Sequence, residues 1–432
     1  MSVRPAQRSD RRPVRIHPAW WVAAVAFLAL FGAAGFRAAP GALMVPLHDE
    51  FGWSTSVMSL AVSINLVLFG LVAPFAAALM DRFGMRRVIS SALFLVALGA
   101  GGSIAMTASW QLLVFWGLLI GTGTGSMALV LAATIADRWF VERRGLVMGI
   151  LTAGSATGQL VILPPVAALA ENVGWRQASL VIAAAAIVVV PLVWAVIRDH
   201  PDERGVLPYG ADPETYLAPT RATGGAVTRA LEGLAFAVRH RAFWALAIAF
   251  AICGATTNGL VGIHFIPSAH DHGMPTTTAA SLMAAVGIFD IVGTIASGWL
   301  TDKFDPRKLL AFYYTFRGVG LLLLPWLLQE SVHPSMILFV VVYGLDWVAT
   351  VPPTAMLCRR IFGDRGTIVF GWVFASHQIG AAAAAFGAGV IRDNLGTYTY
   401  AWWAGATLCV VAASLSILTR GRVATTAPVG RN

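Results

Sequence analysis

A short segment that occurs twice decides the fold. Residues 81–87 read DRFGMRR and residues 302–308 read DKFDPRK, at an offset of 221 positions. A second match, at an offset of 222, aligns residues 140–158 with residues 362–380 and pairs Arg143 with Arg365. Because two separate matches share nearly the same offset, we expect the chain to consist of two related halves.

The composition around these segments is typical of a membrane protein. The 432 residues are 57% hydrophobic and only 12% charged, whereas about a quarter of the residues in a soluble domain are charged. A helix needs roughly 20 apolar residues to cross a bilayer and satisfies its own backbone there. We therefore expect an all-α integral membrane protein with twelve transmembrane helices, at residues 19–45, 54–80, 88–106, 110–136, 145–170, 176–197, 242–267, 277–301, 309–328, 334–358, 366–391 and 397–419.

The longest connection, residues 198–241, is rich in proline and charge, as linkers are. It separates two six-helix bundles. An even number of helices keeps both halves in the same orientation, so we expect a pseudo-two-fold axis along the membrane normal. The expected domains are an N-terminal tail, a first bundle, the linker, a second bundle and a C-terminal tail, at residues 1–18, 19–197, 198–241, 242–419 and 420–432.

Positive charge is distributed unevenly between the loops. Of the 30 Lys and Arg residues, 26 lie in the tails and in every second loop, while the opposite loops hold only Arg176 and Arg392. Cytoplasmic loops carry such an excess. We therefore expect a multi-pass protein of the inner (cytoplasmic) membrane with both termini in the cytoplasm. The net charge of +9 reflects this orientation and does not indicate nucleic-acid binding.

Residues 81–87 resemble the most specific marker of the major facilitator superfamily of transporters. Residues 139–149, WFVERRGLVMG, are similar to the monocarboxylate transporter and oxalate/formate antiporter branch. Residues 289–294, FDIVGT, resemble that branch's helix 8, with Asp290 in place and Thr294 where the branch has Arg. The resemblance covers essentially the whole chain and implies a transporter with the major facilitator fold and a small organic anion as substrate.

Ionisable residues inside the spans point to function. A charge at a helix centre costs at least about 2.5 to 3.5 kcal/mol unless it faces a partner or a cavity. Five such residues lie near the middle depth, where transporters of this kind place their substrate site, namely Arg37, Asp290, Arg317, Asp346 and His377. Three polar residues at a similar depth either line the cavity or bond across helices, namely Asn65, Gln159 and Asn258.

The two buried Arg and two buried Asp sum to zero, so a proton on one Asp would leave a positive charge that favours a carboxylate. We expect proton-coupled transport of a small, monocarboxylate-like organic anion by alternating access, with Arg37 as the anion ligand and Asp290 as the protonatable group. Arg317 and Asp346 fit a structural ion pair equally well. His377 is either a proton relay or a helix-to-helix hydrogen-bonding residue.

Charged residues of the repeated loops form a second group. We expect them to act as a conformational latch by binding neighbouring helix ends when the protein opens outward, because helix termini carry partial charge. The residues concerned are Asp81, Arg82, Arg86, Arg143, Asp302, Arg307 and Arg365.

The sequence speaks against an enzyme, because it contains neither a metalloprotease nor a serine-hydrolase motif, and no P-loop. Its three cysteines lie in apolar stretches, so we expect no cofactor and no metal. The expected partners are the anion, a proton and the lipid bilayer, and we expect a monomer that does not bind nucleic acid. Two alternatives stay open: proton-driven efflux of amphipathic compounds, and a membrane sensor or scaffold that keeps the transporter fold without transporting.

Overall fold

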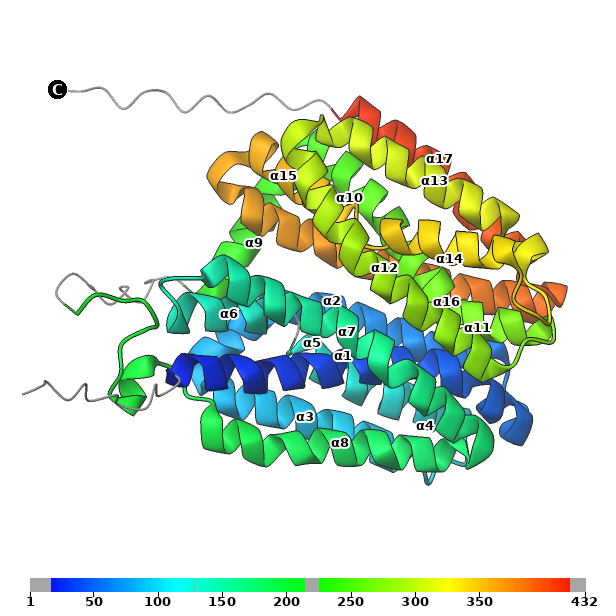
Figure 1. The fold of residues 1–432 in the computed structure, drawn as a ribbon, viewed down its shortest axis with the longest axis horizontal. Coiled ribbons are helices and arrows are strands. Elements are labelled where there is room, and N and C mark those ends of the chain that lie inside the picture. Colours follow the sequence, from blue (N-terminus) through cyan, green and yellow to red (C-terminus); the bar gives the residue numbers. More distant parts are fainter. Residues whose placement is uncertain (1–16, 128, 214–224, 420–432) are drawn as a thin grey trace, which may run out of the picture.

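The computed structural model describes residues 17–127, 129–213 and 225–419. Most of them lie in helices that run along the long axis of the molecule (Figure 1). Within these ranges the structure contains no β-strand beyond an isolated bridge between Phe140 and Tyr209. The expectation of an all-α protein is therefore confirmed.

The first half forms the lower layer of Figure 1. It contains α1 (Pro18–Phe51), α2 (Thr55–Phe83), α3 (Met85–Ser103), α4 (Ser109–Leu112), the π-helical segment η1 (Leu113–Ile120), α5 (Gly121–Gly125), α6 (Leu129–Trp139), α7 (Arg144–Asn172) and α8 (Trp175–Val196). After it come a 3-10 turn, η2 (Pro201–Arg204), and α9 (Ala226–Ala237), which lies between the layers at the left of the view.

The second half forms the upper layer. It contains α10 (Arg241–Gly254), the π-helical segment η3 (Ala255–Val261), α11 (Gly262–Asp271), α12 (Thr276–Lys303), α13 (Pro306–Leu327), α14 (Pro334–Asp346), α15 (Val351–Phe362), the 3-10 turn η4 (Gly363–Arg365), α16 (Gly366–Leu395) and α17 (Thr399–Leu418).

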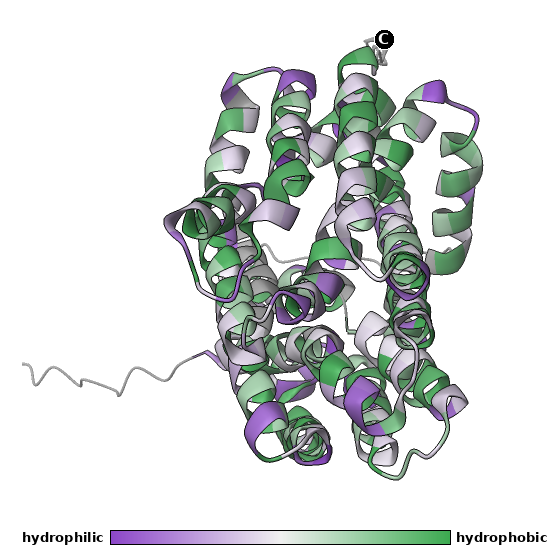
Figure 2. Cartoon of the chain, turned by 90° about the vertical axis from the view of Figure 1, so that its right-hand side faces the viewer, coloured by the Kyte–Doolittle hydropathy of each residue, from purple (hydrophilic) through white to green (hydrophobic). Residues whose placement is uncertain are grey.

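Ten of the described helical stretches are long and apolar enough to cross a membrane. The other two expected spans correspond to α7 and to the broken run from α4 to α6. Hydrophobic residues dominate the helices when the molecule is viewed from one end, and hydrophilic ones gather in the turns (Figure 2). Large apolar side chains also cover the outside, with Ile295 71% and Val410 66% exposed. Such a surface is stable against lipid rather than water.

The two halves repeat one packing scheme. In the first half α1 packs against α7, α3 against α8, and α2 against η1. In the second half the equivalent contacts are those of α10 and η3 with α16, of α13 with α17, and of α12 with α14. The sequence repeat is therefore also a structural repeat.

The repeat extends to a helix break. In the first half α5 ends at Gly125 and α6 begins at Leu129. In the second half α14 ends at Asp346 and α15 begins at Val351. A break inside a span frees backbone groups that need other partners, because hydrocarbon offers none. The second break is where most of the buried charges lie.

We call the end where α1 begins and α2 ends the basic end, because it carries the repeated segments 81–87 and 302–308. We call the other end, where α1 ends and α2 begins, the opposite end.

Candidate functional site

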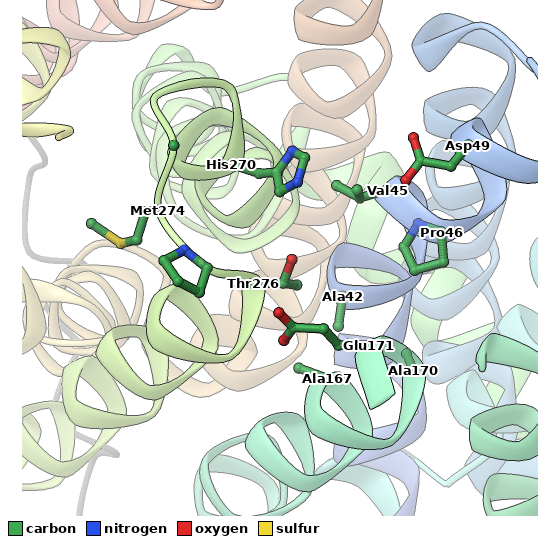
Figure 3. Close-up of a pocket in the computed structure, with 12 residues that line it drawn as sticks. Ala42, Val45, Pro46, Asp49, Ala167, Ala170, Glu171, His270, Met274 and Thr276 are labelled. Atoms are coloured by element: carbon green, nitrogen blue, oxygen red, sulfur yellow. The ribbon is translucent and has the colours of Figure 1, made fainter. Parts of the chain in front are cut away.

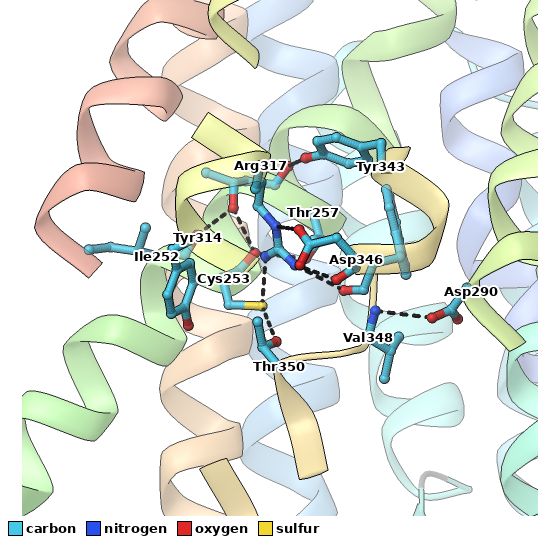
Figure 4. A network of polar contacts seen from close by, with 12 residues as sticks. Ile252, Cys253, Thr257, Asp290, Tyr314, Arg317, Tyr343, Asp346, Val348 and Thr350 are labelled. Atoms are coloured by element: carbon cyan, nitrogen blue, oxygen red, sulfur yellow. Dashed lines mark hydrogen bonds and ion pairs between the residues drawn. The ribbon is translucent and has the colours of Figure 1, made fainter. Parts of the chain in front are cut away.

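Arg317 of α13 and Asp346 of α14 form a buried ion pair in the second half (Figure 4). The Nε atom of Arg317 lies 2.6 Å from Oδ2 of Asp346, and the two residues are 1% and 5% exposed. The other guanidinium nitrogens donate to Sγ of Cys253 at 3.0 Å and to the backbone oxygen of Asp346 at 2.7 Å. Every nitrogen of this guanidinium is therefore engaged inside the second half.

Asp290 of α12 is 5% exposed and points at the break between α14 and α15. Its Oδ1 atom accepts hydrogen bonds from Oγ1 of Thr294 at 2.9 Å and from the backbone N–H of Val348 at 3.0 Å. Arg317 is close enough to act on it electrostatically. In the part of the chain that the structure describes, however, Asp290 forms no ion pair of its own.

Side chains from neighbouring helices bind the backbone of the break. Asp290 accepts from the N–H of residue 348, and Arg317 donates to the carbonyl oxygens of residues 346 and 347, at 2.7 and 3.3 Å. The hydroxyl of Ser297 donates to the carbonyl oxygen of residue 349. A buried backbone group without a partner costs about 1 to 3 kcal/mol. Side chains of α12 and α13 thus stabilise the break. Two of these side chains, Asp290 and Arg317, are charged.

Arg37 lies near the middle of α1 in the first half, and its side chain is partly exposed. Its guanidinium carbon lies 4.3 Å from the centre of the Phe69 ring, a cation–π contact. Among the described residues, no carboxylate lies within ion-pair distance of it. Arg37 therefore differs from Arg317, because no carboxylate of the described part of the chain pairs with it.

His377 of α16 is 7% exposed and lies within electrostatic range of both Arg37 and Arg317. Its ring packs on those of Phe250 and Phe374, with centroid distances of 4.9 and 5.7 Å. Its Nδ1 atom is buried without a hydrogen-bond partner. His377 is thus the residue of the second half that connects the surroundings of Arg37 with those of Arg317.

The three expected polar residues differ in their surroundings. The side chain of Asn65 donates to the backbone oxygen of Trp116 at 2.8 Å, a bond inside the first half. Asn258 lies in η3 and is partly exposed. The side chain of Gln159 lies outside the described residues.

The structure thus brings Asp290, Arg317 and Asp346 together and places His377 near Arg37. Arg37 and Asp290 belong to opposite halves and form no ion pair with each other.

The loop residues expected to act as a latch contact neighbouring segments at the basic end. Nε of Arg86 donates to the carbonyl oxygen of Ile197 at 3.1 Å, just beyond the C-terminus of α8. In the second copy, Arg307 pairs with Asp305 at 2.7 Å. This hydrogen bond holds the pKa of the Asp305 carboxyl below its usual range. The Arg86 bond is the kind of helix-end contact that the sequence predicts, although it lies inside one half.

The exposed arginines of these loops lie over aromatic rings. Arg143 lies 5.9 Å from the ring centre of Tyr209, and Arg365 lies 4.5 Å from that of Phe236 on α9. Arg82 lies over its neighbour Phe83 at 5.3 Å. The side chains of the two loop aspartates are outside the described residues, namely Asp81 and Asp302.

At the opposite end the two halves are joined by Asp393, which lies near the C-terminus of α16. Its carboxylate oxygens accept from the backbone N–H groups of Thr55 and Ser56, at 3.0 and 2.7 Å. These are the first free donors of α2, where the helix dipole favours negative charge. One turn further in, a Cβ on Gly389 would lie 2.5 Å from Oγ of Ser59. The two halves are therefore in close contact at this end.

A cavity of about 390 Å³ also lies at the opposite end, where α1 and α7 face the turn between α11 and α12 (Figure 3). Its polar lining is Asp49, Glu171, His270 and Thr276. Two carboxylates in one cavity disfavour a bound anion. We therefore place the candidate anion site at Arg37 and not in this cavity.

Several residues of these networks were not predicted from the sequence. Cys253, Ser297 and Asp393 contribute hydrogen bonds at the break or between the halves. Their residue types carry no distinctive signal in an apolar helix or at its end. Pro352 and Pro353, which lie in the first turn of α15, do carry a signal for the break, because the residue before a proline avoids the helical region.

The fold, its internal repeat and its buried charges at middle depth define a multi-pass membrane transporter. The chain belongs to the Major Facilitator Superfamily, whose model matches residues 25–369 and 265–431. The family expected from the sequence is confirmed, and with it the conclusion that the protein is a transporter and not an enzyme.

Relatives support this assignment. The chain is 25% identical over 419 residues to the MFS-type transporter YcxA of Bacillus subtilis (strain 168), which covers 92% of this chain and 93% of the relative. It is 27% identical over 395 residues to Monocarboxylate transporter 11 of Mus musculus, covering 88% and 82%. A solved structure of a bacterial homolog of the human lysosomal transporter Spinster has a similar fold, with a TM-score of 0.71 and 18% identity over 93% of this chain and 97% of that chain.

Proposed function

We propose that the protein couples transport of a small, monocarboxylate-like organic anion to that of a proton by alternating access. The observation that carries the proposal is Arg37, a half-buried arginine at middle depth without a carboxylate partner among the described residues. An unpaired charge at this depth is costly. A guanidinium also binds a carboxylate through two parallel hydrogen bonds. An organic anion would therefore supply the partner that Arg37 lacks.

The charges of the second half support a role for the proton. Asp290 and Asp346 face one guanidinium, that of Arg317, so these three buried side chains carry one surplus negative charge when both carboxylates are ionised. Asp346 is paired with Arg317, whereas Asp290 has only neutral donors. We assign the proton to Asp290. Its protonation would leave Asp290, Arg317 and Asp346 neutral in sum and the charge of Arg37 for the anion.

The orientation follows from the positive loops. We place the basic end in the cytoplasm and the opposite end outside the inner membrane, with both termini cytoplasmic. The contact between Asp393 and α2 then closes the outer side. Rocking of the two halves about the middle depth would break this contact and expose Arg37 to the outside. The name of the mouse relative, Monocarboxylate transporter 11, supports the proposed substrate class.

The test is uptake into proteoliposomes that contain the purified protein. Labelled lactate and acetate are supplied with and without an imposed proton gradient, and the variants are Arg37→Ala and Arg37→Lys. We expect gradient-driven accumulation in the unmodified protein and at least a tenfold loss in Arg37→Ala, because an interaction with a charged group contributes about 1.5 to 3 kcal/mol. Arg37→Lys should be intermediate, since an ammonium cannot form the bidentate pair.

Arg239→Ala is the matched control, because this arginine lies in the linker, is exposed and is outside the proposed site. It should transport like the unmodified protein. Accumulation that ignores the proton gradient would overturn the coupling. Equal uptake by Arg37→Ala and Arg239→Ala would overturn the assignment of the anion site.

A further inference from the structure

A series of ring contacts begins at the guanidinium of Arg37. Phe69 of α2 lies under it at 4.3 Å and packs against Phe374 of α16. Phe374 is stacked on His377, with an interplanar angle of 3° and a centroid distance of 5.7 Å, and His377 contacts Phe250 of α10. We call these four residues the ring cluster. It forms a continuous series of ring contacts that begins at Arg37, which has no carboxylate partner among the described residues.

The ring cluster joins the two halves of the protein. Phe69 belongs to the first half, and the other three rings belong to the second. α2 and α16 approach closely here, because a Cβ on Gly70 would lie 2.6 Å from Cβ of Gln378. When the halves rock, Phe69 and Phe374 must move relative to each other. A flat ligand could then lie against one ring from each half.

Buried polar atoms next to the rings have no partner. Nδ1 of His377 and Oε1 of Gln378 form no hydrogen bond with any described residue, and these residues are 7% and 1% exposed. An unpartnered buried polar atom is costly, and most such atoms in proteins are bonded. Arg37 acts electrostatically on His377, and the ring contacts from Phe69 through Phe374 link the two residues.

We infer that the preferred anion is an aromatic monocarboxylate, whose carboxylate pairs with Arg37 while its ring packs on Phe69 and Phe374. This inference rests on the proposed function and adds the substrate class. Aromatic rings favour one another in offset or edge-to-face arrangements with centroids about 4.5 to 7 Å apart, the range already found inside the ring cluster. A short aliphatic acid could pair with Arg37, but it has no ring to pack on Phe69 and Phe374.

Binding to the purified protein tests the inference without leakage of neutral acid through a bilayer. Three probes are titrated by calorimetry: benzoate, cyclohexanecarboxylate and acetate. The first two share charge and approximate size and differ in aromaticity. We expect benzoate to bind about three- to tenfold more tightly than cyclohexanecarboxylate, and acetate to bind most weakly. Phe374→Leu should abolish the difference between the first two, whereas Phe374→Tyr should keep it.

The matched control is Phe386→Leu, on the same helix, where the ring is 40% exposed and lies outside the ring cluster. It should bind all three acids like the unmodified protein, and thermal unfolding of each variant verifies its folding. Equal affinity for benzoate and cyclohexanecarboxylate would overturn the inference that the substrate is aromatic. The same affinity ratio in Phe374→Leu and Phe386→Leu would overturn it as well. If Arg37→Ala still abolished binding of all acids in that case, the proposed function would stand. If Arg37→Ala bound every acid as the unmodified protein does, both the proposed anion site and the inferred aromatic substrate would fail.

Discussion

Replacing Asp393 by alanine should open the opposite end of the transporter. The carboxylate accepts two backbone N–H groups in the first turn of α2, at 3.0 and 2.7 Å. It therefore caps a helix of the other half. The contact exists only while the two halves meet at this end, so its loss should destabilise the closed state and leave the open state unchanged.

The magnitude follows from known capping energies. Loss of a side chain that caps a helix N-terminus costs about 0.5 to 2 kcal/mol. Asp393 is exposed, and solvent and salt weaken exposed charge interactions. We therefore take about 1 kcal/mol, which corresponds to a change of about fivefold in the ratio of closed to open molecules. Asp393→Asn keeps one acceptor oxygen and should produce a smaller change.

Distances between spin labels measure this ratio. Labels at Thr107→Cys and Glu330→Cys report on the opposite end, because these exposed residues lie in loops of different halves there. The three native cysteines are buried, which favours labelling at the introduced sites. Asp393→Ala should enlarge the long-distance fraction about fivefold relative to the short-distance fraction.

Glu50→Ala provides the matched control. Glu50 pairs with Arg176 at 2.6 Å at the same end, but both residues belong to the first half. Loss of this ion pair should leave the distance distribution unchanged. If the two alanine variants gave the same distribution, the claim that Asp393 holds the halves together would be refuted.

Two further predictions concern the buried charges of the second half. Arg317→Leu should lower the free energy of unfolding by about 3 to 5 kcal/mol, since it leaves a buried carboxylate unpaired. Arg317→Leu combined with Asp346→Leu should recover part of this loss, and thermal unfolding in detergent would show it; a double variant less stable than the single one would contradict the ion-pair account. Asp290→Asn should abolish accumulation driven by a proton gradient while exchange of labelled for unlabelled anion persists, because exchange needs no net proton movement. Loss of exchange as well would show that Asp290 does more than carry the proton.

The fold was largely predictable because its determinants are local in sequence. The length of each apolar stretch reflects the bilayer thickness, so the spans could be placed from composition alone. The offset between residues 81–87 and 302–308 revealed the repeat, and α2 and α12 end within one residue of equivalent places, at Phe83 and Lys303. Pro352 and Pro353 indicate an interruption of this span, because the residue before a proline avoids the helical region, but they do not indicate that α14 already ends at Asp346.

The sequence predicted the depth of the site residues in the membrane, but it did not predict which groups each of them contacts. Equal depth identified Arg317 and Asp346 as possible partners, and the structure joins them at 2.6 Å. Depth could not reveal that Asp290 binds the N–H of Val348, because this contact depends on the rotation of α12 and on an unwound segment. Nor could it show that the aromatic neighbour of Arg37 is Phe69. Such contacts depend on the packing of helices that are distant in sequence.

The division of charge between the halves gives the proposed coupling a physical basis. Arg37 contributes one positive charge to the first half, and Asp290 leaves one surplus negative charge in the second. The charges of the four buried residues Arg37, Arg317, Asp290 and Asp346 therefore sum to zero in the empty carrier, and they do so again, together with the anion, in the carrier that holds both anion and proton. A carrier loaded with only one of them would have a net charge at middle depth, where an uncompensated charge costs at least about 2.5 kcal/mol. Rocking would then be fastest for the empty and the doubly loaded forms, which is the condition for tight symport.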